Sequence, residues 1–284
     1  MNKYCDLHTH SHYSDGTCSP AEILPEAEKL GLSAVALTDH NTLEGLPEFL
    51  DAARGSSVQA IAGVEISTGY GGKELHIVGL FLPEDRFPET TEFLSIINRR
   101  KEESNRQMIF NLKKAGYSLD YETIRSAHPQ GTVNRAVIAT ALVEEGYVQS
   151  IREAFQTLLS KKQGYFIPPE RIPALDAIGF LGSVGAVSVL AHPFLNLTET
   201  ELRRFLPEAK AHGLGAIETH YSKFSPEETA LARGIAREFD LAESGGSDFH
   251  GDVKPDISLG IGRGDLKVPA EFATILQRKA GDPS

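Results

Sequence analysis

The chain has 284 residues, of which 40% are hydrophobic and 24% are charged, and its formal net charge is −11. This composition is typical of a soluble globular protein with a full hydrophobic core, and no apolar run approaches the length of a membrane span. The negative charge argues against general affinity for duplex DNA or anionic membranes, because its field repels phosphate polymers. The first residues lack the apolar segment of a secretory signal, so we expect a cytoplasmic protein.

The first predicted strand, from Tyr4 to His10, carries polar side chains at alternate positions. Because side chains on a strand alternate between its two faces, Asp6, His8 and His10 should point the same way. Two neutral imidazoles on one face can hold a metal ion without help from a loop. The alternative is a pair of structural histidines on a half-exposed strand.

Helices and short apolar strands alternate over the next part of the chain. We expect helices over residues 19–31 and 46–53, and strands over residues 33–40, 58–64 and 74–81. Metal-capable side chains occur in or directly after these strands, namely His40, Glu65 and His76. In parallel α/β folds the carboxyl ends of the strands open on one face, where ligands bind.

The pattern becomes helical from about residue 87, with expected helices over 91–115, 133–145 and 150–160. We therefore predict an α/β part formed by residues 1–98 and 165–284, interrupted by a helical insertion over residues 99–164. Asn134 and Arg135 begin one of the predicted helices. The free N–H groups of a helix start, joined by a guanidinium, make a phosphate cradle, so we expect the insertion to act as a substrate cap.

The α/β alternation then resumes to the end of the chain. Helices are expected over 171–181 and 199–212, and strands over 186–191, 215–221 and 241–250. The first of these strands leads into His192, and the last carries Asp248 and His250, which should share a face. His220, Tyr221 and Lys223 close the middle strand and are candidates for contacts with a sugar or base, although His220 is as readily a structural neighbour.

Six histidines and three carboxylates thus gather at predicted strand ends, which packing alone does not explain well. They are His8, His10, Asp15, His40, Glu65, His76, His192, Asp248 and His250. Mixed nitrogen and oxygen ligation suits Mn²⁺, Fe²⁺ or Zn²⁺ better than Mg²⁺, and manganese is our first choice. Two such ions roughly 3.5–4 Å apart can clamp the attacking and leaving oxygens of a phosphate ester.

In chain order these residues form the motifs His-x-His, Thr-Asp-His, Gly-Val-Glu, an isolated His, Ala-His-Pro and Asp-x-His. The set resembles the polymerase and histidinol phosphatase (PHP) family. The resemblance implies a distorted (β/α)7 barrel with two or three divalent ions and the helical insertion as its variable part. It assigns His8, His10, Glu65 and Asp248 to one ion, Glu65, His76 and His192 to a second, and Asp15, His40 and His250 to a third.

Within the family, the insertion and the closing Gly-Gly-Ser-Asp-Phe-His-Gly are most similar to 3′,5′-nucleotide bisphosphate phosphatases. This implies hydrolysis of the 3′-phosphate of a nucleoside 3′,5′-bisphosphate by a metal-bridging hydroxide, with Glu65, Asp15 and His40 as catalytic residues. Arg135 and Asn134 would hold the second phosphate. His220, Asp15 and His40 are candidates for protonating the departing 3′-oxygen.

Three other functions fit the same residues. Two keep the chemistry and change the substrate, to histidinol phosphate or to the 5′ end of a short RNA attacked by an exoribonuclease. The third is a non-catalytic metal-binding module. Such a module would not need Asp15, His40 and His250 in addition to the first two groups of ligands.

Overall fold

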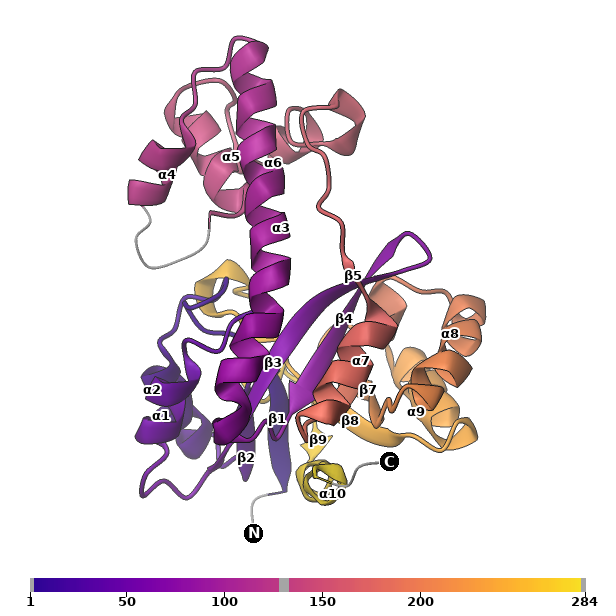
Figure 1. Ribbon diagram of the computed structural model, residues 1–284. Helices are drawn as coiled ribbons and strands as arrows, with labels where there is room; N and C mark the ends of the chain where they lie inside the picture. Colours follow the sequence, from indigo (N-terminus) through magenta and orange to yellow (C-terminus); the bar gives the residue numbers. More distant parts are fainter. Residues whose placement is uncertain (1–2, 128–132, 282–284) are drawn as a thin grey trace. The chain divides into compact units, whose positions relative to one another are not determined.

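The computed structural model describes residues 3–127 and 133–281 (Figure 1). The chain divides into two compact units. The barrel unit comprises Met1–Leu94 and Ile172–Ser284, and the helical unit comprises Ser95–Arg171. Each helix in the described ranges is too short or too polar to cross a bilayer.

The barrel unit is organised by one sheet with the strand order β8-β7-β6-β4-β3-β2-β1-β9, and β5 pairs with β3. The strands are β1 (Tyr4–Thr9), β2 (Ala34–Leu37), β3 (Gln59–Tyr70), β4 (Lys73–Leu80), β5 (Ile172–Pro173), β6 (Val187–Leu190), β7 (Ala216–Tyr221), β8 (Ala242–Gly246) and β9 (Val268–Pro269). Seven of them are four residues or longer. A bridge between Thr9 and Phe249 brings the two ends of the sheet together. This nearly closed sheet confirms the predicted distorted barrel.

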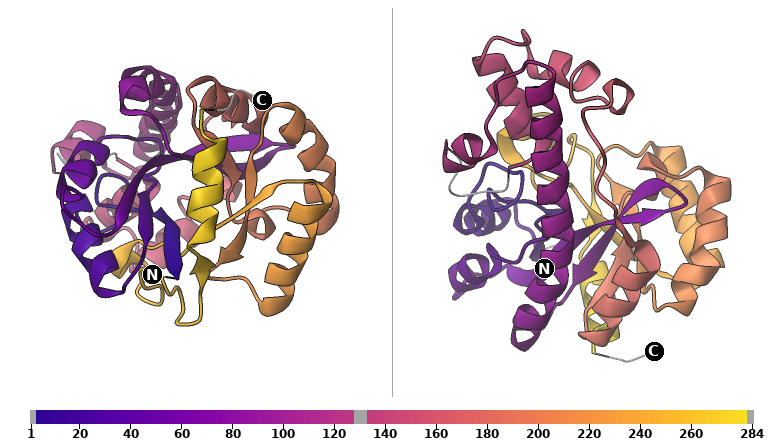
Figure 2. Two further views of the ribbon diagram at one scale, coloured as in Figure 1. Left: turned by 90° about the horizontal axis from the view of Figure 1, so that it is seen from below. Right: turned by 45° about the horizontal axis from the view of Figure 1, so that its top comes forward.

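Helices surround this sheet. Those of the barrel unit are α1 (Pro20–Lys29), α2 (Leu46–Ala52), α7 (Ala174–Ser183), α8 (Glu199–Ala211), α9 (Pro226–Glu238) and α10 (Glu271–Lys279). Short 3₁₀ turns occur at Glu84–Arg86, Pro193–Leu195 and Gly251–Val253. Figure 2 (left) shows α10 lying across the end of the barrel at which β1 begins.

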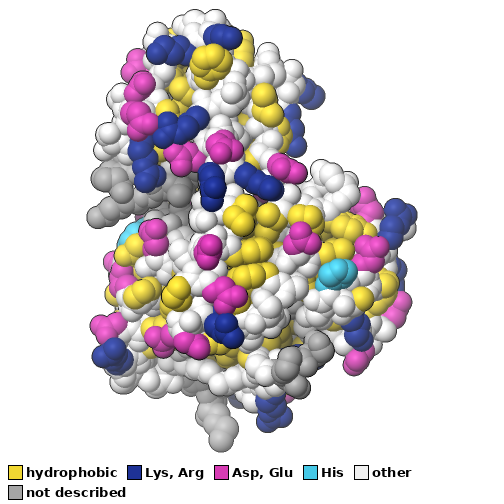
Figure 3. All heavy atoms as spheres, in the orientation of Figure 1, with side chains coloured by type: hydrophobic (Ala, Val, Ile, Leu, Met, Phe, Trp, Pro, Cys, Tyr) yellow, Lys and Arg dark blue, Asp and Glu magenta, His cyan; other side chains and the backbone are white. Residues whose placement is uncertain are grey.

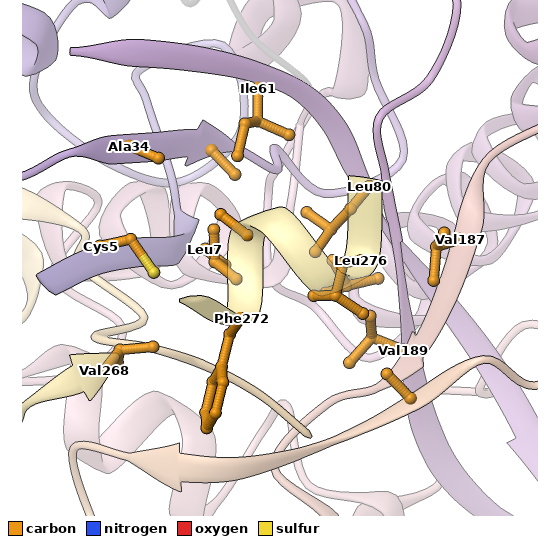
Figure 4. Close-up of a cluster of buried hydrophobic side chains, with 14 of the residues drawn as sticks. Cys5, Leu7, Ala34, Ile61, Leu80, Val187, Val189, Val268, Phe272 and Leu276 are labelled. Atoms are coloured by element: carbon orange, nitrogen blue, oxygen red, sulfur yellow. The ribbon is translucent and has the colours of Figure 1, made fainter. Parts of the chain in front are cut away.

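The main hydrophobic core of the barrel lies beneath α10 (Figure 4). Leu7, Ile61 and Leu80 from three strands pack with Phe272 and Leu276 of the helix. Small apolar residues at alternate positions of the strands complete the cluster, because every second side chain of a barrel strand points inward. The α10 helix, which the sequence pattern did not reveal, therefore closes one end of the barrel with apolar side chains.

The helical unit contains most of α3 (Phe87–Lys114), which begins in the barrel unit, together with α4 (Tyr121–Ala127), α5 (Arg135–Glu144), α6 (Ile151–Gln156) and a 3₁₀ turn at Lys161–Gln163. Its core is separate and includes Met108, Leu112, Ile138, Leu142 and Leu159. Lys and Arg are interspersed with Asp and Glu over the face shown in Figure 3.

Of the strands, β3 and β8 differ most from their predicted bounds, for identifiable reasons. β3 continues to Tyr70, because a hairpin through Gly71 and Gly72, both with positive φ, pairs it with antiparallel β4. Glu65 therefore lies within β3 and not at its end. The last long strand, β8, stops at Gly246, and the chain then bends through Asp248, which has a φ of +58°.

Candidate metal centre

The first strand presents its polar side chains differently from the expected alternation. The register of β1 against β2 shifts between Asp6 and Thr9. The Asp6 carboxylate accepts hydrogen bonds from the Ser247 amide at 2.8 Å and the Gly260 amide at 2.8 Å, whereas His8 faces Glu65. The prediction that Asp6 shares a face with the two histidines is thus wrong, because the irregularity breaks the two-residue period.

Glu65 lies at the centre of a group of five imidazoles. Its Oε2 atom is 3.1 Å from His8 Nε2, 3.2 Å from His10 Nε2 and 3.2 Å from His40 Nδ1. Its Oε1 atom is 2.8 Å from His76 Nδ1 and 3.0 Å from His192 Nε2. Only 1% of Glu65 is exposed. One buried carboxylate thus contacts five imidazoles from four separate places in the chain.

Asp248 approaches the same histidines from the segment after β8. Its Oδ1 atom is 3.4 Å from His10 Nε2, 4.0 Å from His8 Nε2 and 3.4 Å from His250 Nδ1. Its Oδ2 atom accepts hydrogen bonds from the Tyr221 hydroxyl at 2.9 Å and the Lys254 ammonium at 2.8 Å. Asp248 therefore presents one oxygen to the histidine cluster and keeps the other engaged with protein donors.

Asp15 forms a more exposed edge of the cluster. Its oxygens are 3.2 Å from His250 Nε2, 3.9 Å from His10 Nδ1 and 3.9 Å from His40 Nε2. The loop that carries it is held by Asp39, which accepts hydrogen bonds from the Ser11 amide and the Ser14 hydroxyl. All nine sequence-predicted metal ligands thus lie in one connected cluster.

The donor atoms fit divalent metal ions. Within the described ranges, His8 Nε2, His10 Nδ1, His10 Nε2 and His40 Nδ1 are buried without a hydrogen-bond partner, which proteins rarely tolerate. Three groups place their potential ligand atoms within 4.8 Å of one another: His8, His10 and Glu65; His40, Glu65 and His76; and His10, Asp15, His40 and His250. Imidazole nitrogen and carboxylate oxygen are ligands that Mn²⁺, Fe²⁺ and Zn²⁺ accept.

The electrostatics of the cluster favour cations. Burial alone would raise the pKa of Glu65 and of Asp248, but the surrounding histidines hold both pKa values well below their usual range. Burial would lower the pKa of His10 and His76, yet Asp248 and Glu65 raise that of His10 to about 9, and Glu65 and Glu74 raise that of His76 to about 10. In His40 burial prevails and lowers the pKa to about 3.

A pocket of about 270 Å³ opens beside these residues. Besides metal-capable side chains it is lined by Leu195, Asn196, Tyr221, Lys223 and Lys254. The two lysines supply positive charge for an anionic ligand. The volume is slightly below the range for small-molecule sites, which begins at roughly 300 Å³.

His220, a predicted substrate contact, does not line this pocket. The His220 ring packs against Phe272 of α10 with centroids 5.4 Å apart, and its Nδ1 atom lies 2.9 Å from Thr219 Oγ1. The pocket is lined instead by the next residue, Tyr221. His220 thus has the contacts of a structural neighbour, the alternative left open from the sequence, whereas Tyr221 and Lys223, named with it as candidates, line the pocket.

Asn134 and Arg135 lie at the start of α5, as predicted. The Asn134 carboxamide oxygen accepts hydrogen bonds from the amides of Ala136 and Val137. These N–H groups are therefore capped and not free, contrary to the expectation for a phosphate cradle. The Arg135 guanidinium lies over the Phe166 ring, 4.4 Å from its centroid.

Sequence reasoning missed three residues that hold the candidate ligands. Asp39 fixes the loop of Asp15, Lys254 contacts Asp248, and Glu218 contacts His8 and His192. Glu218 could have been found, because it lies two residues after Ala216 on a predicted buried strand and so shares the face of that residue. The other two depend on loop conformations that no local pattern shows.

Comparison with known proteins agrees with this geometry. A 5′-3′ exoribonuclease of Haemophilus influenzae is 34% identical over 88% of this chain and 91% of its own. A 3′,5′-nucleoside bisphosphate phosphatase of Chromobacterium violaceum is 30% identical over 86% of each chain. A solved structure from Bifidobacterium adolescentis, assigned as a metal-dependent phosphoesterase, is 25% identical and superposes with a TM-score of 0.81 over 99% of this chain and 98% of its own.

Fold, site and relatives together define a metal-dependent phosphoesterase. The model of the PHP domain matches residues 6–167. The chain belongs to the PHP family, as its motifs predicted.

Proposed function

We propose that the protein hydrolyses the 3′-phosphate ester of nucleoside 3′,5′-bisphosphates, such as 3′-phosphoadenosine 5′-phosphate, with two or three divalent ions, manganese foremost. The observation that carries this proposal is the contact of Glu65 with five imidazoles beside a pocket close in size to small-molecule sites. A metal-binding module without turnover would require neither this pocket nor its lysines.

The proposed ligands form three sets, and Glu65 is shared by the first two. They are His8, His10, Glu65 and Asp248; Glu65, His76 and His192; and Asp15, His40 and His250. When bound, divalent ions lower the pKa of water and neutralise charge on phosphate oxygens. The chain's part is to hold these donors in place, and their burial favours a fixed geometry.

Hydrolysis joins a water oxygen to phosphorus and breaks the bond between phosphorus and the 3′-oxygen, which takes up one proton. Asp15 and His40 are poorly suited to donate that proton. Burial lowers the pKa of His40 to about 3, and although burial would raise the pKa of Asp15, its hydrogen bond to His250 and the nearby His40 hold it low. Near neutral pH Asp15 is ionised and His40 is the neutral imidazole, so neither is an effective acid, and we assign them as ligands.

Cations around the pocket account for a preference for two phosphates. Lys223 and Lys254 line the pocket and attract the substrate anion. We further propose that the helical unit is a substrate cap. In this proposal Arg135 binds the non-reacting phosphate, and stacking on the Phe166 ring orients its guanidinium. A cytoplasmic location, and the lack of duplex DNA or membrane partners, remain predictions from the sequence.

A 5′-3′ exoribonuclease acting on short RNA is the second candidate. It is favoured by the Haemophilus influenzae relative, whose identity of 34% exceeds the 30% of the bisphosphate phosphatase. The two reactions share their chemistry, because each can break the bond between phosphorus and the 3′-oxygen of a nucleotide that carries a 5′-phosphate. They differ in whether the phosphorus also carries the next nucleotide of an RNA chain.

Manganese-loaded protein should be assayed against 3′-phosphoadenosine 5′-phosphate, a short 5′-phosphorylated RNA and histidinol phosphate, with Glu65→Gln protein as the inactive control. The proposal expects the highest kcat/KM on the bisphosphate, with inorganic phosphate and adenosine 5′-monophosphate as products. A higher kcat/KM on the RNA, with release of 5′-mononucleotides, selects the exoribonuclease. Turnover of histidinol phosphate alone contradicts both.

A further inference from the structure

Glu218 is a buried carboxylate on β7, and only 2% of it is exposed. Its Oε1 atom lies 3.2 Å from His8 Nδ1, and its Oε2 atom accepts a hydrogen bond from the His192 amide at 2.6 Å. Within residues 3–127 and 133–281, both hydrogen bonds of this side chain involve proposed metal ligands. A carboxylate is costly to bury, so its partners indicate what it is for.

We propose that Glu218 is a positioning residue that orients His8 and His192 together and so couples two of the ion sites. The inference rests on the proposed metal centre. His8 belongs to the ligand set with His10 and Asp248, and His192 to the set with His76. Through Glu65, which both imidazoles contact, the two sets are already joined on their inner side. Glu218 joins them on the outer side.

The contact with His8 selects which ring nitrogen faces the ions. A carboxylate only accepts hydrogen bonds, so Nδ1 of His8 carries the hydrogen that Glu218 receives. Nε2 is then the ligand atom, and it lies 3.1 Å from Glu65 Oε2 and 4.0 Å from Asp248 Oδ1. A carboxylate behind an imidazole also makes the ring a stronger electron donor to a metal.

The contact with His192 acts through the backbone. His192 has a φ of +26°, a conformation that side-chain-bearing residues seldom adopt. The hydrogen bond from its amide to Glu218 stabilises this conformation, and the ring then points Nε2 at Glu65 Oε1, 3.0 Å away. One carboxylate thus fixes a tautomer in His8 and a backbone bend in His192.

The substitution Glu218→Gln separates this role from simple packing. Glutamine keeps the shape but offers one acceptor oxygen and one NH₂ group. The His192 amide can only donate, so it takes the oxygen and leaves the NH₂ group facing His8 Nδ1. Nδ1 must then accept, which places the ring hydrogen on Nε2, the atom that faces the ions.

The matched control is Glu243→Gln on the adjacent strand. Glu243 pairs with Ile217 of β7 and accepts hydrogen bonds from Thr219 at 3.0 Å and Arg233 at 2.9 Å, so it contacts no proposed ligand. Manganese affinity of metal-free protein should be measured by competition with a chelator. We expect Glu218→Gln to weaken binding by about 10- to 100-fold and Glu243→Gln to change it by less than about twofold.

Two outcomes would overturn the inference while leaving the metal centre intact. One is wild-type manganese affinity in Glu218→Gln with a lowered melting temperature of its metal-free form, which marks a purely structural residue. The other comes from ¹⁵N NMR of zinc-loaded wild-type protein, which needs no variant to fold. The proposal requires a hydrogen on His8 Nδ1 and metal on Nε2, and the reverse arrangement contradicts it. Failure of wild-type protein to bind metal would instead overturn the proposed function, and this inference with it.

Discussion

The barrel unit and the helical unit use buried polar residues in opposite ways. In the helical unit, Ser104 and Asn105 are buried and donate hydrogen bonds to the backbone carbonyls of Ile167 and Val133. The barrel unit instead buries Glu65 among imidazoles, and four nitrogens of His8, His10 and His40 lack hydrogen-bond partners in the described ranges. These two buried side chains of the helical unit thus find partners within the chain, whereas the buried nitrogens of the barrel unit are suited to bind cations.

The two units also differ in net charge. Residues 95–171 contain twelve Lys and Arg against eight Asp and Glu, although the whole chain has a net charge of −11. The negative charge is therefore concentrated in the barrel unit, where it favours metal ions, while the helical unit is better suited to phosphate. Changes in the barrel unit should abolish metal binding, and changes in the helical unit should alter substrate preference or stability.

The largest effect is expected for Glu65→Gln. The substitution preserves shape but removes the carboxylate that contacts five imidazoles. We expect phosphate release to fall by at least about a thousandfold, with a lower metal content of the purified protein. Elemental analysis and a phosphate assay measure both quantities. Retention of metal and activity would show that Glu65 is not the shared ligand.

Metal removal should have the next largest effect on activity, and the affinity for manganese should depend on pH. The raised pKa values of His10, about 9, and His76, about 10, mean that both rings are protonated at pH 7.5 in the metal-free protein. Ligating imidazoles are neutral, so adding manganese should release protons. The apparent affinity should then rise between pH 7 and 9, by up to about tenfold per pH unit for each proton displaced.

Calorimetry in two buffers with different ionisation enthalpies measures the proton release. Chelated protein should be inactive and should regain activity when manganese returns. Binding without proton release at pH 7.5 would show that these histidines are not the ligands.

Removing one tyrosine hydroxyl from each unit allows a direct comparison of the effects on metal affinity and on stability. Tyr221→Phe takes away the donor to Asp248 Oδ2, and we expect about a tenfold loss of manganese affinity. Tyr147→Phe leaves the Ser118 amide without its acceptor and should cost about 1 kcal/mol of unfolding free energy. Its metal affinity should match wild type. Similar metal affinities in the two variants would remove the distinction between the units.

The smallest effect on kcat is expected for Arg135→Ala. If Arg135 binds the non-reacting phosphate, KM for the bisphosphate should rise by about tenfold, and more than KM for a plain phosphomonoester. Arg106→Ala is the control, since Arg106 lies in the same unit and also over an aromatic ring, that of Tyr121. Equal changes in KM for both substrates contradict the assignment of Arg135.

The resemblance of the motifs to the PHP family implied the barrel, and metal-capable residue types at predicted strand ends indicated that nine side chains converge. Periodicity also located β6 and β7 to within one residue, since short apolar runs bounded by helices leave few alternatives. The helical insertion was visible as a loss of strand pattern. The positions of the strands and of the insertion depend on patterns that are local in the chain.

The errors arose where the two-residue period breaks. Asp6 was placed on the same face as His8 and His10 because the register shift that follows it in β1 was not foreseen. Glu65 was placed at a strand end because the antiparallel hairpin with β4 was not foreseen. Glu218 was overlooked because its role depends on His8 and His192, which lie far away in the sequence.

Anomalous X-ray diffraction from crystals grown with manganese tests the central claim most directly. The account predicts two or three manganese peaks within coordination distance of the nine side chains, with Glu65 contacting at least two of them. Peaks elsewhere on the molecule, or a cluster in which Glu65 contacts no manganese, would contradict it.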